Sequence, residues 1–497
     1  MHHSYVDGVP VLRFSEPGPL HATLRFGVGA RDETYRMLGI SRLVAALAVH
    51  AVRQQLPETA EPVVSSGLEE TRFTVSGTRE EVAECLAVLC RVLPDLPADR
   101  LGEVAPALDG EAARSLDPRA VGALNARYGS QAVGLEGHER SQHHLPTADM
   151  LLGHAAVWFT RSNAVLTLTG PEPVGLRLPL PPGERPRRFA PQARYPRASW
   201  THRNIDGVAL SVETPVGSAA AAVAHRILRE RVTAALADQQ GPAAPAEAAA
   251  ALHDSGTVVR LLLAPASASD AEGVAATVWS QALSLARDEP APAEVARHRS
   301  LPEGPSARLR TLDHAARAEL FGTPCLDEGS RRRALESVIP RNVRDSWQRA
   351  IQRAQLVVPA GLLLCFAGPD GRRLWCTSCW TWDETAPWGQ VFREPRAKRA
   401  FKRAAERHWM VLTDKSVVSC TPGAYHELRF DDVIALERWG LERNLIGRCG
   451  CTIGVDPAWY RDGQRLVRAV DEAVSAELAF DGTGTPPPDH PSPSAEP

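Results

Sequence analysis

The sequence predicts an α+β fold: two homologous α/β sandwich repeats, each a sheet with helices, and then a small β-rich domain with a closing helix. Three observations support this prediction. Strand and helix patterns alternate over residues 1–170. A similar order begins again after a Pro- and Arg-rich stretch at residues 171–199. Residues 361–480 then carry further strand patterns that belong to neither repeat.

The first repeat, residues 1–170, opens with a strand pattern from Leu20 to Gly29. The apolar spacing from Leu38 to Arg53 predicts a helix. Thr78 begins a Thr-x-x-Glu capping box, in which the hydroxyl and the carboxylate satisfy free backbone N–H groups of a helix start. We therefore expect another helix from Val82 to Leu93.

Residues 171–199 lack apolar periodicity and are rich in proline and arginine, which predicts a linker. From residue 200 the order restarts, with a strand from Val208 to Val212 and a long helix near residues 217–238. Residues 200–360 are therefore predicted to be a second repeat of the same kind, and the likeness between the repeats is one of order rather than of residues.

Residues 361–480 are predicted to form a β-rich module. The strand runs around 411–418 and 428–436, with a helix from 463 to 478, resemble the strands and closing helix of bacterial pleckstrin-homology-like or GRAM-like modules. The tail, residues 481–497, is rich in proline and serine and is predicted to be disordered.

Composition excludes several classes of protein. Hydrophobic residues make up 44% and charged residues 23%, as in soluble globular proteins, and a formal net charge of -3 argues against a dedicated nucleic-acid binder. The start of the chain lacks the pattern of a signal peptide, and no apolar run approaches the ~20 residues of a membrane span. Nine cysteines, an odd number without a secretion signal, predict reduced thiols and a cytoplasmic location.

The segment Gly-Val-Gly-Ala-Arg-Asp-Glu at 27–33, with Gly39 opening an apolar helix, resembles the start of the insulinase/pitrilysin zinc peptidases. This family includes the mitochondrial processing peptidase subunits. Its members carry a Gly-x-x-His-x-x-Glu-His segment at this place. The resemblance extends over the whole first repeat and implies that both repeats are insulinase-type.

The resemblance places the first zinc-binding histidine of the family on Arg42, the general-base glutamate on Ala45 and the second histidine on Ala46. Arginine stays protonated and offers no lone pair to a cation, and alanine has no donor atom at all. The third ligand of the family is a glutamate, for which Glu111 is the candidate. One carboxylate does not hold a catalytic zinc, so a solvated or arginine-paired Glu111 is expected and no cofactor is predicted.

The substrate-holding residues of the family also have no counterpart. Its members carry an arginine and a tyrosine in a Leu-Arg-Glu-x-x-Gly-Leu-Ala-Tyr-type segment of the second repeat. In the favoured register these fall on Ala237 and Ala244. An alternative register on Leu228-Arg229-Glu230 keeps an arginine but no tyrosine. The residues that contact a peptide therefore stay unassigned.

The resemblance implies a catalytically inactive peptidase homologue, not an enzyme by itself. It would form a heterodimer with an active insulinase-type subunit and help to enclose a peptide. Two alternatives stay open. The chain could be a stand-alone peptide-binding or scaffold protein that docks through its C-terminal module, or an active metallopeptidase with relocated zinc ligands.

Two Cys-rich segments near the C-terminus could bind a structural zinc, because four thiolates are a frequent ligand set for this metal. The alternative is ordinary packed thiols on a buried strand, which the tryptophans flanking the first pair favour. The candidate ligands are Cys376, Cys379, Cys449 and Cys451.

Two further groups are weighed against simpler interpretations. A basic helical face could contact an anionic surface or an acidic partner, although a solvated face is the simpler interpretation. His138, His143 and His144 crowd one loop without an acidic residue or cysteine at ligand spacing, so a solvated loop is expected. The basic face consists of Arg396, Arg399, Arg403 and Arg407.

Overall fold

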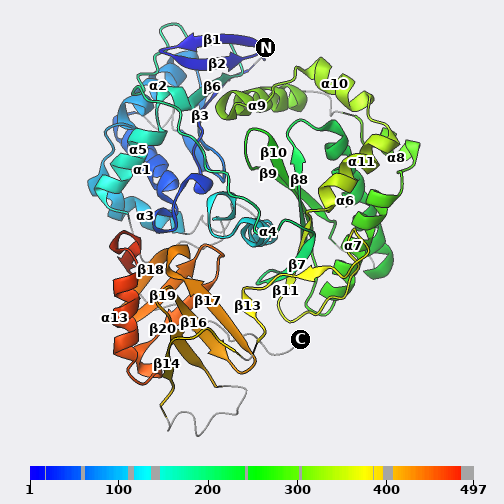
Figure 1. Ribbon diagram of the computed structural model, residues 1–497. Coiled ribbons are helices and arrows are strands. Elements are labelled where there is room, and N and C mark those ends of the chain that lie inside the picture. The colour runs from blue at the N-terminus through cyan, green and yellow to red at the C-terminus, as the bar shows by residue number, and fades with distance from the viewer. Residues whose placement is uncertain are drawn as a thin grey trace.

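The structure is a computed structural model that describes residues 1–482 except 17, 57–61, 110–116, 136–145, 241–243, 301–304, 384 and 396–406. These residues form two halves, each built on a six-stranded sheet, and a C-terminal part with two smaller sheets (Figure 1). The predicted mixed architecture of sheets covered by helices is confirmed. Most of the tail predicted to be disordered lies outside the described residues.

The sheet of the first half has the strand order β1-β2-β6-β3-β5-β4, in which only the β2 and β6 pair is parallel. Helices α1, α2, α3 and α5 pack together on this half, and their apolar side chains join those of the strands in one core. The bounds are β1 His2–Val6, β2 Val9–Arg13, β3 Leu20–Phe26, β4 Val63–Ser66, β5 Thr71–Gly77, β6 Ala164–Leu168, α1 Ile40–Gln55, α2 Arg79–Val92, α3 Leu101–Asp109 and α5 Ala148–Trp158.

The capping box predicted at Thr78 is confirmed. The Thr78 hydroxyl accepts a hydrogen bond from the backbone N–H of Glu81 at 3.2 Å, and the Glu81 carboxylate accepts one from the backbone N–H of Thr78 at 2.8 Å. This reciprocal pair satisfies two N–H groups that the helix itself leaves open, and it fixes where α2 begins.

The sheet of the second half has the order β12-β7-β11-β8-β10-β9. Its β7 and β11 pair is parallel, and the pairs β11-β8, β8-β10 and β10-β9 are antiparallel, as in the corresponding strands of the first sheet. The bounds are β7 Ser199–Arg203, β8 Val208–Pro215, β9 Glu247–Leu252, β10 Thr257–Ala264, β11 Gln355–Pro359, β12 Trp375–Cys376, α6 Ala219–Gln240, α7 Ala271–Arg287, α8 Pro292–Arg297, α10 Glu328–Glu336 and α11 Pro340–Ile351.

The two halves exchange helices. Helix α4 (Pro118–Tyr128) comes from the sequence of the first half but contacts β8, β10 and β11 of the second sheet. Helix α9 (Pro305–Phe321) comes from the second half but contacts β2 and β6 of the first sheet, where Leu312 and Leu320 are buried (Figure 1). Because burying one leucine contributes roughly 1.5–3 kcal/mol, each exchanged helix helps to hold the halves together.

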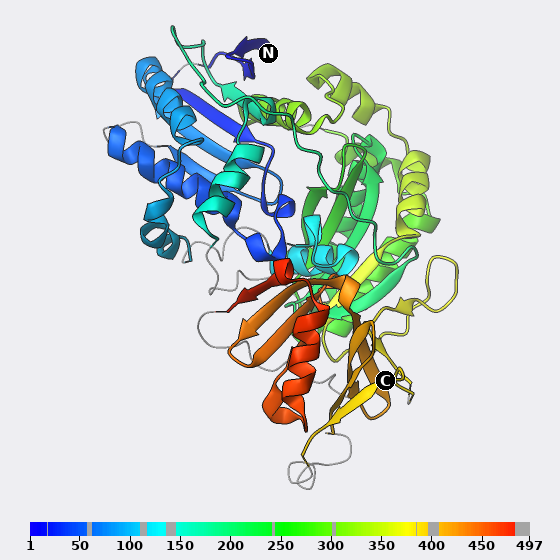
Figure 2. The same ribbon diagram turned by 60° about the vertical axis from the view of Figure 1, so that its left-hand side comes forward.

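The C-terminal part contains a five-stranded antiparallel sheet, β13-β17-β16-β15-β14, and a four-stranded sheet, β20-β19-β18-β21. Helix α13 buries Leu466, Val467 and Val470 in the core of this part. Figure 2 shows the C-terminal part lying below both halves. The bounds are β13 Trp380–Thr381, β14 Gln390–Arg393, β15 Trp409–Leu412, β16 Ser416–Thr421, β17 Ala424–Arg429, β18 Val433–Trp439, β19 Glu442–Gly447, β20 Thr452–Val455, β21 Ala479–Asp481 and α13 Gly463–Ala473.

Two segments contact parts of the molecule outside the domain to which the sequence pattern assigned them. The strand β12 lies within the predicted C-terminal module, yet it pairs in parallel with β7 of the second sheet. Residues 171–198 contain no helix or strand, but Leu176 and Leu178 are buried in the core of the first half. Residues 171–198 therefore form an ordered strap rather than a linker without contacts.

One segment of the described chain, residues 35–55, is long and apolar enough by composition to cross a membrane. It contains α1, whose Leu43, Val44 and Leu47 are buried in the core of the first half. Its apolar character is explained by this packing between α2, α3 and α5.

Candidate functional site

The start of α1 is held by a buried carboxylate. Glu33 accepts hydrogen bonds from the backbone N–H groups of Gly39, at 2.6 Å, and Ser41, at 3.0 Å. These are among the N–H groups that a helix leaves without internal partners at its N-terminus. Burial raises the pKa of Glu33 to about 7, against the effect of the two donors, which favour the charged form. Glu33 thus fixes the position of the first turn of α1.

A buried histidine supports the same turn. The Ser41 hydroxyl and the His154 Nε2 atom lie 2.9 Å apart, and both side chains are buried. Burial lowers the pKa of His154 to about 4, so this imidazole is neutral at physiological pH. It contacts Ser41 rather than a group of metal ligands, since no metal-ligand group including His154 occurs among the described residues.

Arg42, Ala45 and Ala46 lie on α1, as the resemblance requires. Positions 42 and 46 are one turn apart, the spacing at which two histidines could reach one metal. The Ala45 side chain is fully buried in the first core, and the other two are partly buried. Arg42 and the two alanines supply no donor, so these residues do not fit a catalytic zinc. Glu111 and the histidines at 138, 143 and 144 lie outside the described residues.

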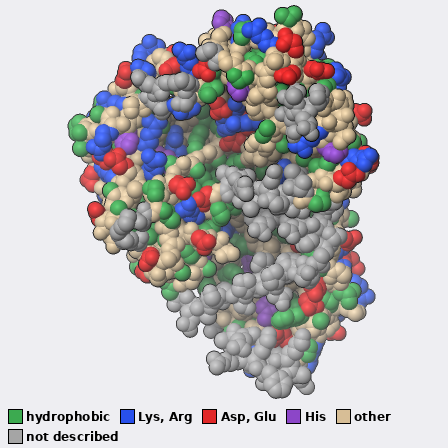
Figure 3. Space-filling view, turned by 180° about the vertical axis from the view of Figure 1, so that it is seen from behind, with side chains coloured by type: hydrophobic (Ala, Val, Ile, Leu, Met, Phe, Trp, Pro, Cys, Tyr) green, Lys and Arg blue, Asp and Glu red, His purple; other side chains and the backbone are tan. Residues whose placement is uncertain are grey.

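A cavity of about 560 Å³ lies between the two halves. The edge strands of both sheets line it, β4 through Ser65 and β9 through Ala249 and Ala250, together with residues of the exchanged helices. Seen from behind, the molecule is hollowed between the halves, and basic and acidic side chains gather at the rim (Figure 3). A ligand in this cavity would therefore contact both sheets at once.

Ion pairs close one wall of this cavity. Glu69 and Glu70, in the turn between β4 and β5, are both buried and both pair with Arg317 of α9, the distance from Arg317 Nη1 to Glu70 Oε1 being 2.7 Å. Glu69 also accepts a hydrogen bond from the backbone N–H of Leu252, at the end of β9. Arg25 on β3 pairs with Asp313 of α9 at 2.6 Å. These contacts join the first sheet to elements from the second half.

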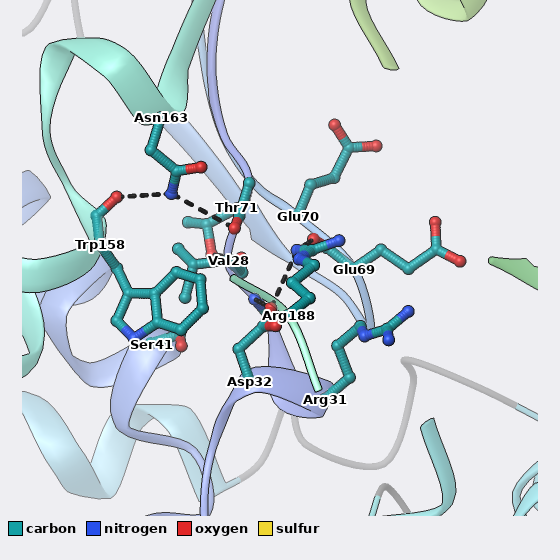
Figure 4. Close-up of polar contacts among 12 residues, drawn as sticks. Val28, Arg31, Asp32, Ser41, Glu69, Glu70, Thr71, Trp158, Asn163 and Arg188 are labelled. Carbon is teal, nitrogen blue, oxygen red and sulfur yellow. Dashed lines mark hydrogen bonds and ion pairs between the residues drawn. The ribbon is translucent and has the colours of Figure 1, made fainter. Parts of the chain in front are cut away.

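The strap adds a second layer to this network. Arg188 lies between Asp32, at 2.9 Å, and the backbone carbonyl of Glu69 (Figure 4). Arg31, beside Asp32, donates to the backbone carbonyls of Leu252 and His253 of the second half, and burial lowers its pKa to about 10. Arg31 and Asp32 belong to the segment 27–33 that resembles the insulinase family. This segment therefore contributes to contacts between the halves.

The remaining predicted positions are scattered. Ala237, near the end of α6, and Ala244, before β9, are exposed, and neither lines the cavity. Arg407 is exposed, whereas Arg396, Arg399 and Arg403 lie outside the described residues. The predicted basic face and the peptide-holding register thus remain predictions.

Three of the four candidate cysteines come together, and one does not. Cys379, Cys449 and Cys451 form a group with His426 of β17, while Cys376 pairs with Trp200 within the second sheet. His426 stands between Tyr425 and Glu427 without any ligand spacing in the sequence. Only the pairing of β13 with β17, which aligns Trp380 with His426, brings it beside Cys379.

The C-terminal part contacts the first half close to α1. Tyr35, just before α1, packs with Ala435, Ile446 and Phe480. Arg36 donates to the backbone carbonyl of Glu477 at 3.0 Å. The start of α1 is therefore flanked by the C-terminal part.

Comparison with known proteins identifies the fold. No protein-family model and no curated protein sequence matches the chain. Among solved structures, the peptidase M16 inactive domain from Pseudomonas fluorescens is 14% identical, with a TM-score of 0.59, and the match covers 73% of this chain and 98% of that one. A protease from Helicobacter pylori is 13% identical, with a TM-score of 0.58, and the match covers 72% and 98%.

The first half of the periplasmic protease PqqL from Escherichia coli is 12% identical, with a TM-score of 0.52, and the match covers 72% of this chain and 91% of that one. A chain of complex III2 from Candida albicans is 13% identical, with a TM-score of 0.53, over 72% and 95%. At these identities the comparison shows the fold alone. The chain has the mixed α/β fold of the M16 (insulinase-type) peptidase structures.

Proposed function

We propose that this chain is a catalytically inactive insulinase-type peptidase homologue that forms a heterodimer with an active zinc peptidase and helps to enclose a peptide. The observation that carries the proposal is the set of residues on α1: Arg42, Ala45 and Ala46 stand where the resemblance expects two zinc ligands and a general base. None of them can bind zinc or remove a proton from water. A chain with this fold and without these donors is suited to shaping a substrate chamber.

The cavity between the halves supports a peptide as the ligand. An extended peptide can add to a sheet edge through backbone hydrogen bonds, and the edge strands β4 and β9 both line this cavity. The small side chains of Ala249 and Ala250 leave room beside β9. Arg72 and Asp313 at the wall pair with each other at 3.6 Å, so polar side chains of a peptide would compete with this ion pair.

The ion pairs between the halves limit the length of peptide that the cavity can hold. Arg317 holds Glu69 and Glu70, so the cavity is closed on the side of α9. A peptide longer than the cavity requires these pairs to separate, or a second subunit to supply the rest of the chamber. Both requirements fit a protein that works together with a partner.

The test compares the purified chain with a mixture. The full chain, loaded with zinc, is incubated with a fluorogenic peptide library alone and together with an active homologue of similar size that has an intact His-x-x-Glu-His motif. We expect no cleavage by the chain alone, co-elution with the homologue, and cleavage by the mixture above that of the homologue. Ordinary turnover by the chain alone would overturn the proposal.

A matched pair of variants connects the test to the cavity. Arg317→Ala removes the contact with Glu69 and Glu70, whereas Arg308→Ala removes an exposed arginine from the same helix. We expect only Arg317→Ala to change the rate at which a labelled peptide is captured by the mixture. Equal rates for the two variants would mean that this cavity does not receive the peptide.

The second candidate function is a stand-alone binding or scaffold protein that docks through its C-terminal part. The observation in its favour is a series of exposed tryptophans, because exposed tryptophan is typical of protein contact surfaces. It predicts peptide or protein capture with no effect of an active homologue, and weaker capture after substitution of these residues by alanine. They are Trp382 and Trp388, which are 54% and 99% exposed, with Trp375 of β12 in the adjoining second sheet, which is 68% exposed.

Three narrower expectations belong to the same proposal. We place the protein in the cytoplasm, which cell fractionation tests. We assign the strands β14 to β20 and helix α13 to a pleckstrin-homology-like module, and exposed Arg407 as one contact of that module with an anionic surface. The alternative of an active metallopeptidase with relocated ligands requires a metal site with an open position for water, which metal analysis and X-ray absorption of the purified chain would detect.

A further inference from the structure

Four potential metal ligands converge where the C-terminal part meets the two halves. The Sγ atoms of Cys379, Cys449 and Cys451 and a ring nitrogen of His426 all lie within 4.8 Å of one another. Cys379 precedes β13, His426 is on β17, and the other two stand in the turn between β19 and β20. In a tetrahedral zinc site with Zn–S bonds of about 2.3 Å, neighbouring sulfurs are about 3.8 Å apart. The four side chains are therefore close to this arrangement.

The backbone of the β19–β20 turn places its two cysteines on one side. Gly447 donates to the carbonyl of Cys451 at 2.8 Å, and Gly450 donates to the carbonyl of Gly447 at 2.9 Å. Gly450 has a φ of 80°, which disfavours other residues, and a Cβ at this position would lie 2.6 Å from the side chain of Asn125 on α4. The turn is thus formed tightly against the end of α4.

The positive charge of Arg194 beside the Cys/His group suits a zinc ion bound by several thiolates. Arg194 of the strap donates to the Cys379 sulfur at 3.2 Å and to the backbone carbonyl of Cys449 at 3.0 Å. A zinc ion with three thiolates and a neutral imidazole carries a net charge of minus one, which one arginine neutralises. Arg194 also orients a ligand, as the residues around metal ligands commonly do.

The other buried cysteines provide a comparison. Cys85 and Cys90 are buried in the apolar core of the first half, and Cys420 is buried in a small apolar cluster of the C-terminal part. Among the described residues, none of these three cysteines belongs to a group of potential metal ligands. The convergence of Cys379, His426, Cys449 and Cys451 is therefore not a general consequence of burying a thiol.

We propose that Cys379, His426, Cys449 and Cys451 bind one structural zinc ion. With four protein donors the site is closed, leaving no position for an activated water, so the metal supports folding rather than catalysis. It joins the connection from the second sheet, both sheets of the C-terminal part and, through Arg194, the strap. Its neighbour Arg448 accepts a hydrogen bond, on its backbone carbonyl, from the N–H of Ser130 just after α4. The ion would therefore fix the C-terminal part to both halves.

The test measures metal on freshly purified full chain. Elemental analysis should give one zinc per chain, and X-ray absorption of the same sample should give three sulfur neighbours and one nitrogen neighbour. Replacement by cobalt should give the intense visible bands of a tetrahedral thiolate site. Less than a tenth of a zinc per chain, or a disulfide among the three cysteines in protein purified under reducing conditions, would overturn the proposal.

Variants locate the metal. Cys379→Ser and His426→Ala should lose the zinc, whereas Cys376→Ser and Cys420→Ser remove cysteines outside the group and should keep it. The absorption spectrum of the unaltered chain carries the test even where a variant fails to fold. A coordination of two or fewer sulfurs would contradict the assignment, and an added oxygen neighbour would instead favour a catalytic metal.

Discussion

The start of α1 and the Cys/His group are two places where this fold could hold a metal, and they differ in how the ligands are brought together. A zinc motif on α1 would use residues one helical turn apart, and there the chain has Arg42 and Ala46. The Cys/His group takes its residues from three segments that are distant in sequence. The loss of a local motif is visible in a sequence, whereas the gain of a site assembled by folding is visible only in the structure.

Removal of the metal should produce the largest difference between the two regions. Structural zinc sites contribute an apparent binding free energy of about 10–16 kcal/mol at pH 7. A chelator should therefore expose β17, β19 and β20 to hydrogen exchange, measured by mass spectrometry. Helix α1 and the first sheet should keep their protection, because their packing includes no metal ligand group among the described residues.

The variant Cys376→Ser provides the control, since this cysteine lies in the second sheet outside the group. It should respond to the chelator as the unaltered chain does. Loss of protection at α1, or unchanged protection at β19 and β20, would contradict the expectation that removing the metal affects only the region of the Cys/His group.

Restoring the zinc motif on α1 should destabilise the protein without creating a site. Ala45 is fully buried among apolar side chains, so Ala45→Glu places a carboxyl inside the core of the first half. We expect a loss of about 3 kcal/mol or more in the free energy of unfolding, measured with urea. Ala46→His, at a partly exposed position, should cost about 1 kcal/mol.

The triple variant with histidine at 42, glutamate at 45 and histidine at 46 extends this test to metal content. It should still contain one zinc per chain, because two histidines need a third ligand to hold a catalytic zinc. A second equivalent of zinc, together with peptide cleavage, would mean that the first half retains the remainder of a catalytic site.

A substitution of Arg194 tests whether zinc affinity depends on a residue that orients a ligand without being one. Arg194→Gln leaves all four ligands in place but removes the charge beside Cys379. We expect zinc affinity to fall about 10- to 100-fold, measured by competition with a chromophoric chelator. Arg197→Gln, which removes an exposed arginine nearby, should have no effect. Equal affinities for both variants would assign Arg194 to packing alone.

The order of strands and helices, and the absence of metal donors at residues 42, 45 and 46, follow from the sequence because they depend on short-range patterns. The apolar periodicity of α1 and the capping box at Thr78 are examples. The exchange of α4 and α9 between the halves was not predicted, since an apolar helix face does not indicate which sheet it covers.

The candidate site residues also differ in whether the sequence could indicate them. Proximity in sequence placed Cys376 beside Cys379, but the strand β12 carries Cys376 into another sheet. His426 and Arg194 reach the group only through strand pairing and the path of the strap, so no local spacing could indicate them. The ion pairs of Arg317 with Glu69 and Glu70 also connect residues from different halves.

A further expected effect is a pH dependence at α1 that does not depend on a metal. Glu33 has its pKa raised to about 7, so the folded chain holds this proton more tightly than the unfolded chain, and the contribution to stability is lost as pH rises from about 4.5 to 7. His154 has its pKa lowered to about 4, so its contribution is gained as pH rises from about 4 to 6.5. The two slopes oppose each other.

Removing one group should therefore reveal the other. Between pH 4.5 and 6.5 the free energy of unfolding of Glu33→Gln, relative to the unaltered chain, should rise by up to about 1.4 kcal/mol per pH unit. His154→Asn should show the opposite slope, and both differences should be the same with and without added zinc, because neither side chain belongs to the Cys/His group. If the free energy of unfolding of the three proteins changes with pH in the same way, the pKa values of these groups do not change on folding. A slope that depends on zinc would indicate a metal near α1.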